Sequence, residues 1–273
     1  MDTKLSANFE TITPELATAL IQRNTHNRLV SQVTVNKYAD DLRAGRWGMN
    51  GEAIKIAEDG TLLDGQHRLW AVIETGISLD MLVVRGLPIK AQDTMDLGRK
   101  RSVSDALTID RVKYASTVAA IAGLLLKLRG SNQTSSMHSL QPSSTAVRQF
   151  VDAHIDELVA SASAASGARS GSPVPRIATG VLHYVATNHM NCEFAVGTFI
   201  EVLKSGVPTY TNDPAYRLRE KLMRLKMSGT TLKTAPVLAA TANAFTHFID
   251  QKPLSKVFWK GTIEFPGVDL TKL

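Results

Sequence analysis

The chain has 273 residues, 44% of them hydrophobic and 21% charged, so it can bury one large hydrophobic core or two smaller ones. Its single cysteine, Cys192, excludes an intramolecular disulfide and zinc sites built on paired cysteines, which suits a reducing, cytoplasmic compartment. No apolar run approaches the roughly 20 residues that span a bilayer, and residues 1–10 do not resemble a signal peptide, so we expect no membrane partner.

The net charge of +6 is unevenly distributed along the chain. Residues 1–110 carry 13 lysines and arginines against 15 acidic residues, whereas residues 111–273 carry 18 against 10. A basic C-terminal part is typical of a protein with a polyanionic partner such as DNA, although a solvated basic surface is the ordinary alternative.

The N-terminal part combines helical patterns with short strands. A helix is predicted over residues 12–23, where Thr13 is placed to cap it and Pro14 to begin it, and a second over residues 36–44. From residue 53 apolar and polar side chains alternate, which predicts a hairpin with its turn at Asp59-Gly60. A helix that ends at Gly76 and a strand over residues 79–84 follow.

Beyond residue 110 the chain changes character. Residues 114–128 are apolar and alanine-rich, as expected of a buried helix, and the serine- and glycine-rich stretches 130–144 and 161–175 are predicted to be loops. We therefore expect an α+β fold, with a small mixed α/β domain over residues 1–110 and an all-α domain over residues 111–273. The other helical patterns cover residues 145–159, 176–188, 193–204, 214–226 and 235–249.

The turn Asp64-Gly65-Gln66-His67-Arg68 passes from a predicted strand directly into a helix. The first turn of a helix attracts anions, and Gly65 has no β-carbon to block one. Arg68 offers a fork for phosphate oxygens, His67 can donate a hydrogen bond or move a proton, and Asp64 can hold Mg²⁺ or orient a hydroxyl. The structural alternative is that Asp64 caps the helix and Arg68 pairs back to it one turn later.

Residues 63–69 resemble the phosphate-binding motif of the ParB/sulfiredoxin superfamily, which includes phage ParB-like proteins. The pair Asn27-Arg28, a helix, the loop Asn50-Gly51 and the strand around Ile54 precede it in the order of ParB-like N-terminal domains, so the resemblance covers about residues 8–107. It implies a sulfiredoxin-like fold that binds nucleotide phosphates through Gly65, Gln66, His67 and Arg68, with Arg28 and Asn50 nearby.

Members of that superfamily use the loop differently, so the resemblance does not decide the activity. Partition proteins bind CTP and clamp DNA, sulfiredoxins use ATP to phosphorylate a cysteine sulfinic acid, and related enzymes phosphorylate serine. Gln66 stands where sulfiredoxins have their cysteine, which disfavours that chemistry. The loop from Asp64 to His67 is more similar to the kinase-like members.

Two basic segments are further candidates. In residues 94–102, Asp96 is placed to bind metal or act as a base, and Arg99 or Arg101 to hold phosphate or a nucleic-acid backbone. The alternative is a solvated basic turn before a helix over residues 103–107. In the helix over residues 214–226, Arg217, Arg219 and Arg224 are candidates for DNA contact, against the alternative of a solvated outer face.

The leading hypothesis is a nucleotide-dependent phosphotransferase of a phage or mobile element. In it Asp64, His67, Arg68 and Asp96 carry the chemistry, ATP or another nucleoside triphosphate is used with Mg²⁺, and the acceptor is a hydroxyl group. The most specific acceptor is a hydroxymethylated base in DNA. The alternatives are a nucleotide-gated ParB-like DNA-binding protein without turnover and a ParB-like nuclease. The helical domain is expected to bind DNA or to form a homodimer.

Overall fold

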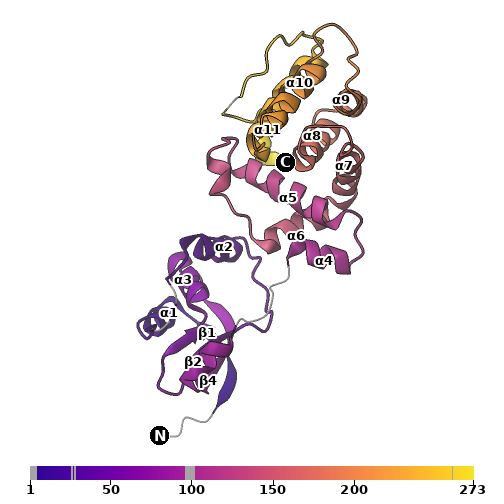
Figure 1. The fold of residues 1–273 in the computed structure, drawn as a ribbon. Coiled ribbons are helices and arrows are strands. Elements are labelled where there is room, and N and C mark those ends of the chain that lie inside the picture. Colours follow the sequence, from indigo (N-terminus) through magenta and orange to yellow (C-terminus); the bar gives the residue numbers. More distant parts are fainter. Residues whose placement is uncertain (1–4, 26, 28, 96–101, 260) are drawn as a thin grey trace. The chain divides into compact units, whose positions relative to one another are not determined.

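The fold was analysed in a computed structural model that describes residues 5–25, 27, 29–95, 102–259 and 261–273. The fold class is α+β, as predicted, with a four-stranded sheet and its helices followed by a helical part (Figure 1). The chain divides into two compact units, unit 1 (residues 1–100) and unit 2 (residues 101–273). The division falls before helix α4 (Val103–Ile109), not after it, because Leu107 of α4 is buried in the helical core.

Unit 1 is built on a mixed sheet with the strand order β1-β4-β2-β3. Strand β1 pairs antiparallel with β4, β2 pairs parallel with β4, and β3 pairs antiparallel with β2. The sequence did not predict β1, because within it only Ile12 at its end is buried and no apolar alternation marks it. The strands are β1 (Ser6–Ile12), β2 (Ala53–Ala57), β3 (Leu62–Asp64) and β4 (Leu79–Leu87).

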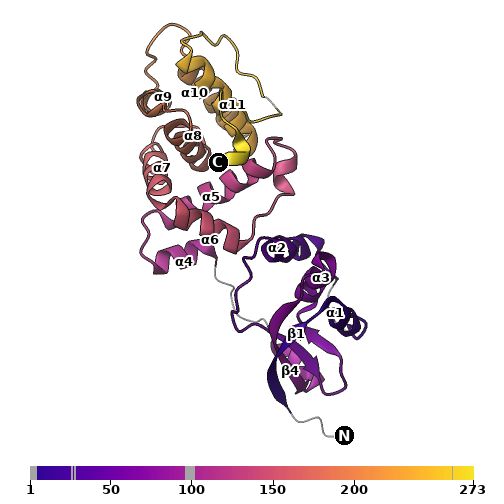
Figure 2. The ribbon, with the colours of Figure 1, turned by 180° about the vertical axis from the view of Figure 1, so that it is seen from behind.

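In the described part of unit 1 three helices accompany this sheet: α1 (Pro14–Ile21), α2 (Gln32–Arg43) and α3 (Gln66–Thr75). Both views show α3 between α1 and α2 (Figures 1 and 2). The Thr13 hydroxyl accepts a hydrogen bond from the Leu16 amide, so the predicted cap of α1 is confirmed. The core between helices and sheet contains Ile12, Leu20, Val35, Ile54, Leu62, Leu69 and Val83.

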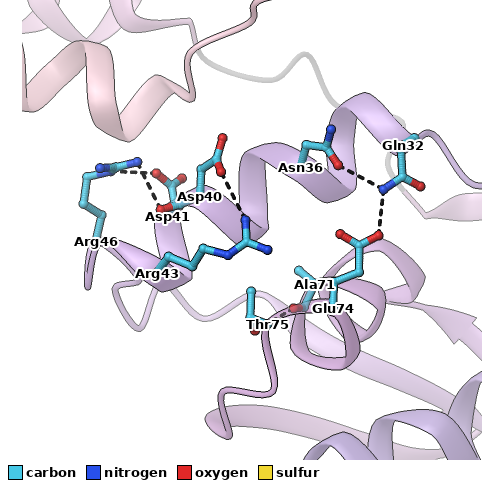
Figure 3. A network of polar contacts seen from close by, with 9 residues as sticks. All are labelled: Gln32, Asn36, Asp40, Asp41, Arg43, Arg46, Ala71, Glu74 and Thr75. Atoms are coloured by element: carbon cyan, nitrogen blue, oxygen red, sulfur yellow. Dashed lines mark hydrogen bonds and ion pairs between the residues drawn. The ribbon is translucent and has the colours of Figure 1, made fainter. Parts of the chain in front are cut away.

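Polar side chains join α2 to α3 on the outside of this layer (Figure 3). The Gln32 amide donates to the Asn36 side chain at 2.9 Å and to the Glu74 carboxylate of α3 at 2.7 Å. At the other end of α2, Arg46 pairs with the buried Asp41 at 2.8 Å. The bond from Gln32 to Glu74 ties the start of α2 to the last turn of α3 and complements the apolar packing of the two helices.

Unit 2 consists of helices around one large core, in which α5 carries the buried side chains Val118, Ile121 and Leu125. No helix in the described part of either unit is long and apolar enough to cross a membrane. The helices after α4 are α5 (Ala115–Gly130), α6 (Ser144–Ala153), α7 (Ile155–Gly167), α8 (Arg176–Asn188), α9 (Glu193–Ser205), α10 (Pro214–Met227) and α11 (Thr234–Ile249), and the short 3-10 turns are η1 (Ile89–Thr94), η2 (Ser136–His138) and η3 (Leu270–Lys272).

Two predictions for unit 2 were wrong. The helix expected over residues 145–159 is interrupted at His154, whose backbone (φ −134°, ψ 35°) is not helical. The loop expected over residues 161–175 begins as helix, because α7 continues to Gly167. Its small side chains are packing surface, not linker: Ala162 and Ala165 are buried, and α7 lies against α8.

Candidate functional site

The candidate site is the junction at which β3 becomes α3. Gly65 joins them with φ +105°, in the left-handed region that favours glycine. A β-carbon built there would lie 2.3 Å from Cδ1 of Ile54, so the backbone packs directly on strand β2. The glycine was predicted to make room for an anion, but the neighbour that this structure places against it is an isoleucine side chain.

Asp64, at the end of β3, lies between two cations. The Lys55 ammonium is 3.1 Å from Oδ2 of Asp64, and the Arg68 guanidinium is 3.6 Å from the same oxygen. Arg68 also donates to the carbonyl of Ala53 at 2.8 Å. The side chain of Arg68 is only 9% exposed, whereas those of Lys55 and Asp64 are 26% and 24% exposed. Arg68 therefore braces the loop from inside, and Lys55 is the more accessible cation.

Lys55 was not recognised from the sequence, because a β-bulge brings it to Asp64. Ile56 pairs with Leu62, and the next pair is Lys55 with Asp64, so one strand carries an extra residue, Leu63. Both Leu62 and Leu63 are buried as a result. A regular ladder counted back from the turn would pair Lys55 with Leu63 instead, and nothing in the residue pattern announces the shift.

An amide network fixes the segment before α2 against the loop. The Asn24 side chain donates to Oε1 of the buried Gln66 at 2.9 Å, and Asn27 donates to Asn24 at 2.6 Å and to the Leu62 carbonyl at 2.7 Å. Gln92, from η1, donates to the Asn27 side chain at 3.0 Å. Gln66 was predicted to bind phosphate; here its side-chain oxygen accepts a hydrogen bond from the protein. Asn24 and Gln92 were not predicted.

His67 is buried and holds the loop that leads into α2. Its Nε2 accepts a hydrogen bond from the backbone amide of Ser31 at 3.0 Å. An imidazole nitrogen that accepts a hydrogen bond carries no proton, so in this arrangement Nε2 does not donate to a phosphate as predicted. The contact instead connects the first turn of α3 to the residue that precedes α2.

Of the remaining predicted ligands in unit 1, only Asn50 is described. Its side chain accepts a hydrogen bond from the Glu52 amide at 3.0 Å and shapes an exposed turn before β2. The candidates Arg28, Asp96, Arg99 and Arg101 lie outside the described residues.

The predicted Mg²⁺ ligand, Asp64, does not fit that role as the side chains stand. Its Oδ2 already lies beside Lys55 and Arg68, and these cations would oppose a third positive charge. Within the described residues no three His, Cys, Asp or Glu side chains gather where they could hold a metal ion. We therefore derive no chemical step through a metal held by Asp64.

The three arginines predicted to bind DNA lie on α10 in different environments. Arg217 bonds with Glu220 at 3.0 Å and with Asn212 at 2.7 Å. Arg219 turns inward and donates to the carbonyl of Leu203 at 2.7 Å and to that of Gly171. Only Arg224 is largely exposed, at 76%. Arg219 thus supports the fold, and Arg224 is the arginine of this helix best placed to meet a polyanion.

Comparisons of the chain with protein-family models, with curated proteins and with solved structures found no match.

Proposed function

We propose that unit 1 binds a nucleoside triphosphate at the first turn of α3 and that the protein transfers the terminal phosphoryl group to a hydroxyl acceptor. The observation that carries the proposal is the partly exposed Lys55–Asp64 pair directly before the helix. A lysine ammonium and the positive end of a helix dipole both favour a phosphate at this position.

In this proposal the partly exposed pair does the chemistry and the buried side chains hold it in place. Lys55 exchanges the Asp64 carboxylate for a phosphate oxygen, and Asp64 then accepts the proton of the attacking hydroxyl. The bond between the γ-phosphorus and the bridging oxygen breaks as the new phosphorus–oxygen bond forms, and the nucleoside diphosphate leaves. Arg68, His67 and Gln66 keep the loop in position through their hydrogen bonds to Ala53, Ser31 and Asn24.

The resemblance of residues 63–69 to the ParB/sulfiredoxin motif supports nucleotide binding, and the basic charge of unit 2 supports DNA as the carrier of the hydroxyl. A hydroxymethylated base is the acceptor that combines both features. This function would place the protein in the cytoplasm of a bacterial or phage-infected cell. ATP is the first candidate nucleotide, supplied with Mg²⁺.

A second candidate function is a nucleotide-gated DNA-binding protein without acceptor turnover. The charge distribution favours this candidate, because DNA binding alone would account for the excess of cations in residues 111–273, without any phosphoryl transfer. In that case unit 2 would bind DNA or form a homodimer when unit 1 holds nucleotide.

One assay separates these possibilities. The protein is incubated with Mg²⁺, with γ-labelled ATP, CTP or GTP, and with ordinary or hydroxymethylated DNA. Label on the DNA is the expected result. Retention of DNA that depends on nucleotide but leaves no label supports the second candidate, and strand breakage would indicate a nuclease. If no nucleotide binds at all, both proposed functions are wrong.

The variant Lys55→Gln tests the carrying observation. Because a hydrogen bond to a charged group contributes about 1.5–3 kcal/mol, nucleotide affinity should fall roughly 10- to 100-fold. Arg43→Gln is the matched control, since Arg43 is an exposed cation of unit 1 that pairs with Asp40 on α2 (Figure 3). An equal loss of affinity in both variants would show that general charge, and not the junction, governs binding.

A further inference from the structure

A small apolar cavity opens on unit 2 where the end of α10, the loop to α11 and the C-terminal segment meet. Its volume is about 240 Å³. Trp259 of the C-terminal segment forms one wall and remains 42% exposed. The rest of the lining is mainly aliphatic and includes Leu225, Leu232, Lys233, Pro236 and Val237.

The surroundings of this cavity carry positive charge. Residues 221–237 include Lys221, Arg224, Lys226 and Lys233 and no acidic residue. All four of these cations lie on exposed positions. Residues 250–259 add Lys256, and Lys252, which pairs with Asp250 at 2.9 Å. Glu220, one turn before Arg224 on α10, pairs with Arg217 at 3.0 Å and with Arg224 at 3.6 Å, and the Arg224 side chain remains 76% exposed. A ligand of this region therefore has an apolar part for the cavity and negative charge outside it.

The volume of the cavity favours a small ligand group. Pockets that enclose a whole drug-sized ligand measure roughly 300–1,000 Å³, so this cavity suits a single ring system. An amphipathic helical peptide would need a row of pockets for several side chains along one face. A nucleic-acid strand has both an apolar part for the cavity and negative charge outside it. The face of one base can stack on an aromatic side chain, and the sugar-phosphate backbone carries the charge.

We propose that the cavity takes one unpaired base of a single-stranded nucleic acid, stacked on Trp259, while Lys226, Lys233 and Arg224 contact the flanking phosphates. Bases in an intact duplex are stacked inside it and do not present a free face. The inference rests on the proposed function in one respect: that function makes nucleic acid the partner of unit 2, and the inference specifies that the bound form is single-stranded. It requires no nucleotide in unit 1.

The test uses the full chain without nucleotide and a fluorescein-labelled 12-residue oligothymidine, whose anisotropy reports binding. Trp259→Ala should weaken binding roughly 5- to 100-fold, the effect of losing one base–aromatic stack, and Trp259→Phe should largely restore it. Lys226→Gln and Lys233→Gln should each reduce the slope of log affinity against log salt by about 0.7. Circular dichroism checks that each variant is folded.

Lys113→Gln is the matched charge control. Lys113 is exposed in the connection between α4 and α5, and α4 lies at the end of unit 2 away from α10 (Figures 1 and 2). Its loss should leave affinity for the oligonucleotide unchanged. If Lys113→Gln lowers the affinity and the salt slope as much as Lys233→Gln does, the whole basic surface, and not this cavity, attracts the strand.

Several outcomes overturn the proposal: unchanged binding in Trp259→Ala, equal affinity for the duplex of the same sequence, or equal affinity for base-free polyphosphate. The proposal is also wrong if an acidic amphipathic peptide binds through Trp259 and the oligonucleotide does not bind. Failure of the proposed function is distinguishable. Lys55→Gln should bind the oligonucleotide normally, and Trp259→Ala should bind nucleotide normally.

Discussion

At Gly65 the chain has positive φ and no room for a β-carbon, and these two constraints can be separated by mutation. Gly65→Ala should destabilise unit 1 by about 2–3 kcal/mol, since it adds a steric clash with Ile54 to the strain of the left-handed conformation. Gly76→Ala, at φ +68° where an added β-carbon would meet no atom from elsewhere in the chain within 4 Å, should cost only about 1 kcal/mol. Urea unfolding of both variants in a Trp259→Phe background, where Trp47 and Trp70 of unit 1 are the remaining tryptophans, measures both effects by fluorescence.

The clash itself is tested by a second change. Ile54→Val removes Cδ1, the atom that a β-carbon on residue 65 would meet, so the double variant Ile54→Val/Gly65→Ala should lose less stability than the sum of the single variants. Strict additivity would show that backbone strain alone accounts for the glycine.

Single residues of the site were predicted with mixed success. The sequence places Asp64 and Arg68 at a strand-to-helix junction, and the pairing named as the structural alternative is present at 3.6 Å. Asp64 does not cap the helix, because Gly65 occupies the N-cap position and no side-chain hydrogen bond caps the helix there. The sequence does not reveal that His67 and Gln66 bond to Ser31 and Asn24, because those contacts join residues 36 and 42 positions apart. The local sequence shows which interactions a residue type can make. The tertiary structure determines which partner that residue contacts.

Arg219 joins three elements of unit 2: it extends from α10 to the carbonyl of Leu203 near the end of α9 and to that of Gly171 in the loop before α8. Arg219→Gln should therefore destabilise unit 2 by about 2–3 kcal/mol, the contribution of charged hydrogen bonds to these carbonyls. Arg224→Gln should change stability by less than about 0.5 kcal/mol, because that side chain is exposed.

Circular dichroism during urea unfolding distinguishes the two variants. Oligonucleotide binding should show the reverse order, with Arg224→Gln affecting affinity and Arg219→Gln affecting it only where unit 2 is partly unfolded. Equal stability of the two variants would contradict the structural role of Arg219.

Whole elements were predicted where composition and period agree. The hairpin at Asp59-Gly60 and the helix that ends at Gly76 have both a period and a terminating residue, and both are present. The sequence failed where tertiary packing overrides a local preference: at the bulge around Leu63, and in α7, whose serines and alanines are typical of a linker. The break at His154 also has no breaker residue to mark it.

Across the molecule, acid sensitivity is expected in unit 2. Burial lowers the pKa of His183, partly opposed by Glu193, and burial with the positive charge of His154 and Arg129 lowers the pKa of His189. The unfolded chain therefore binds protons below about pH 6.5 that the folded chain does not. The free energy of unfolding is therefore highest above that pH. It decreases as the pH falls from there through the lower, folded-state pKa values of the two histidines.

The measurement is the free energy of unfolding of the full chain between pH 7.5 and 5. We expect it to decrease on acidification, and to decrease less in His183→Gln, whose amide can still hydrogen-bond the Ser161 hydroxyl that contacts His183 at 3.1 Å. If both proteins show the same pH dependence, His183 is not a source of the acid sensitivity.

The place of α4 has a practical consequence for dividing the chain. A fragment that begins at residue 111, as composition alone suggests, lacks Leu107 and leaves a hole in the core that this side chain fills. One that begins at residue 101 keeps α4, with the reciprocal cap between Ser102 and Asp105 that starts it. Of two otherwise identical recombinant products, the longer should be the one that stays in solution and crystallises.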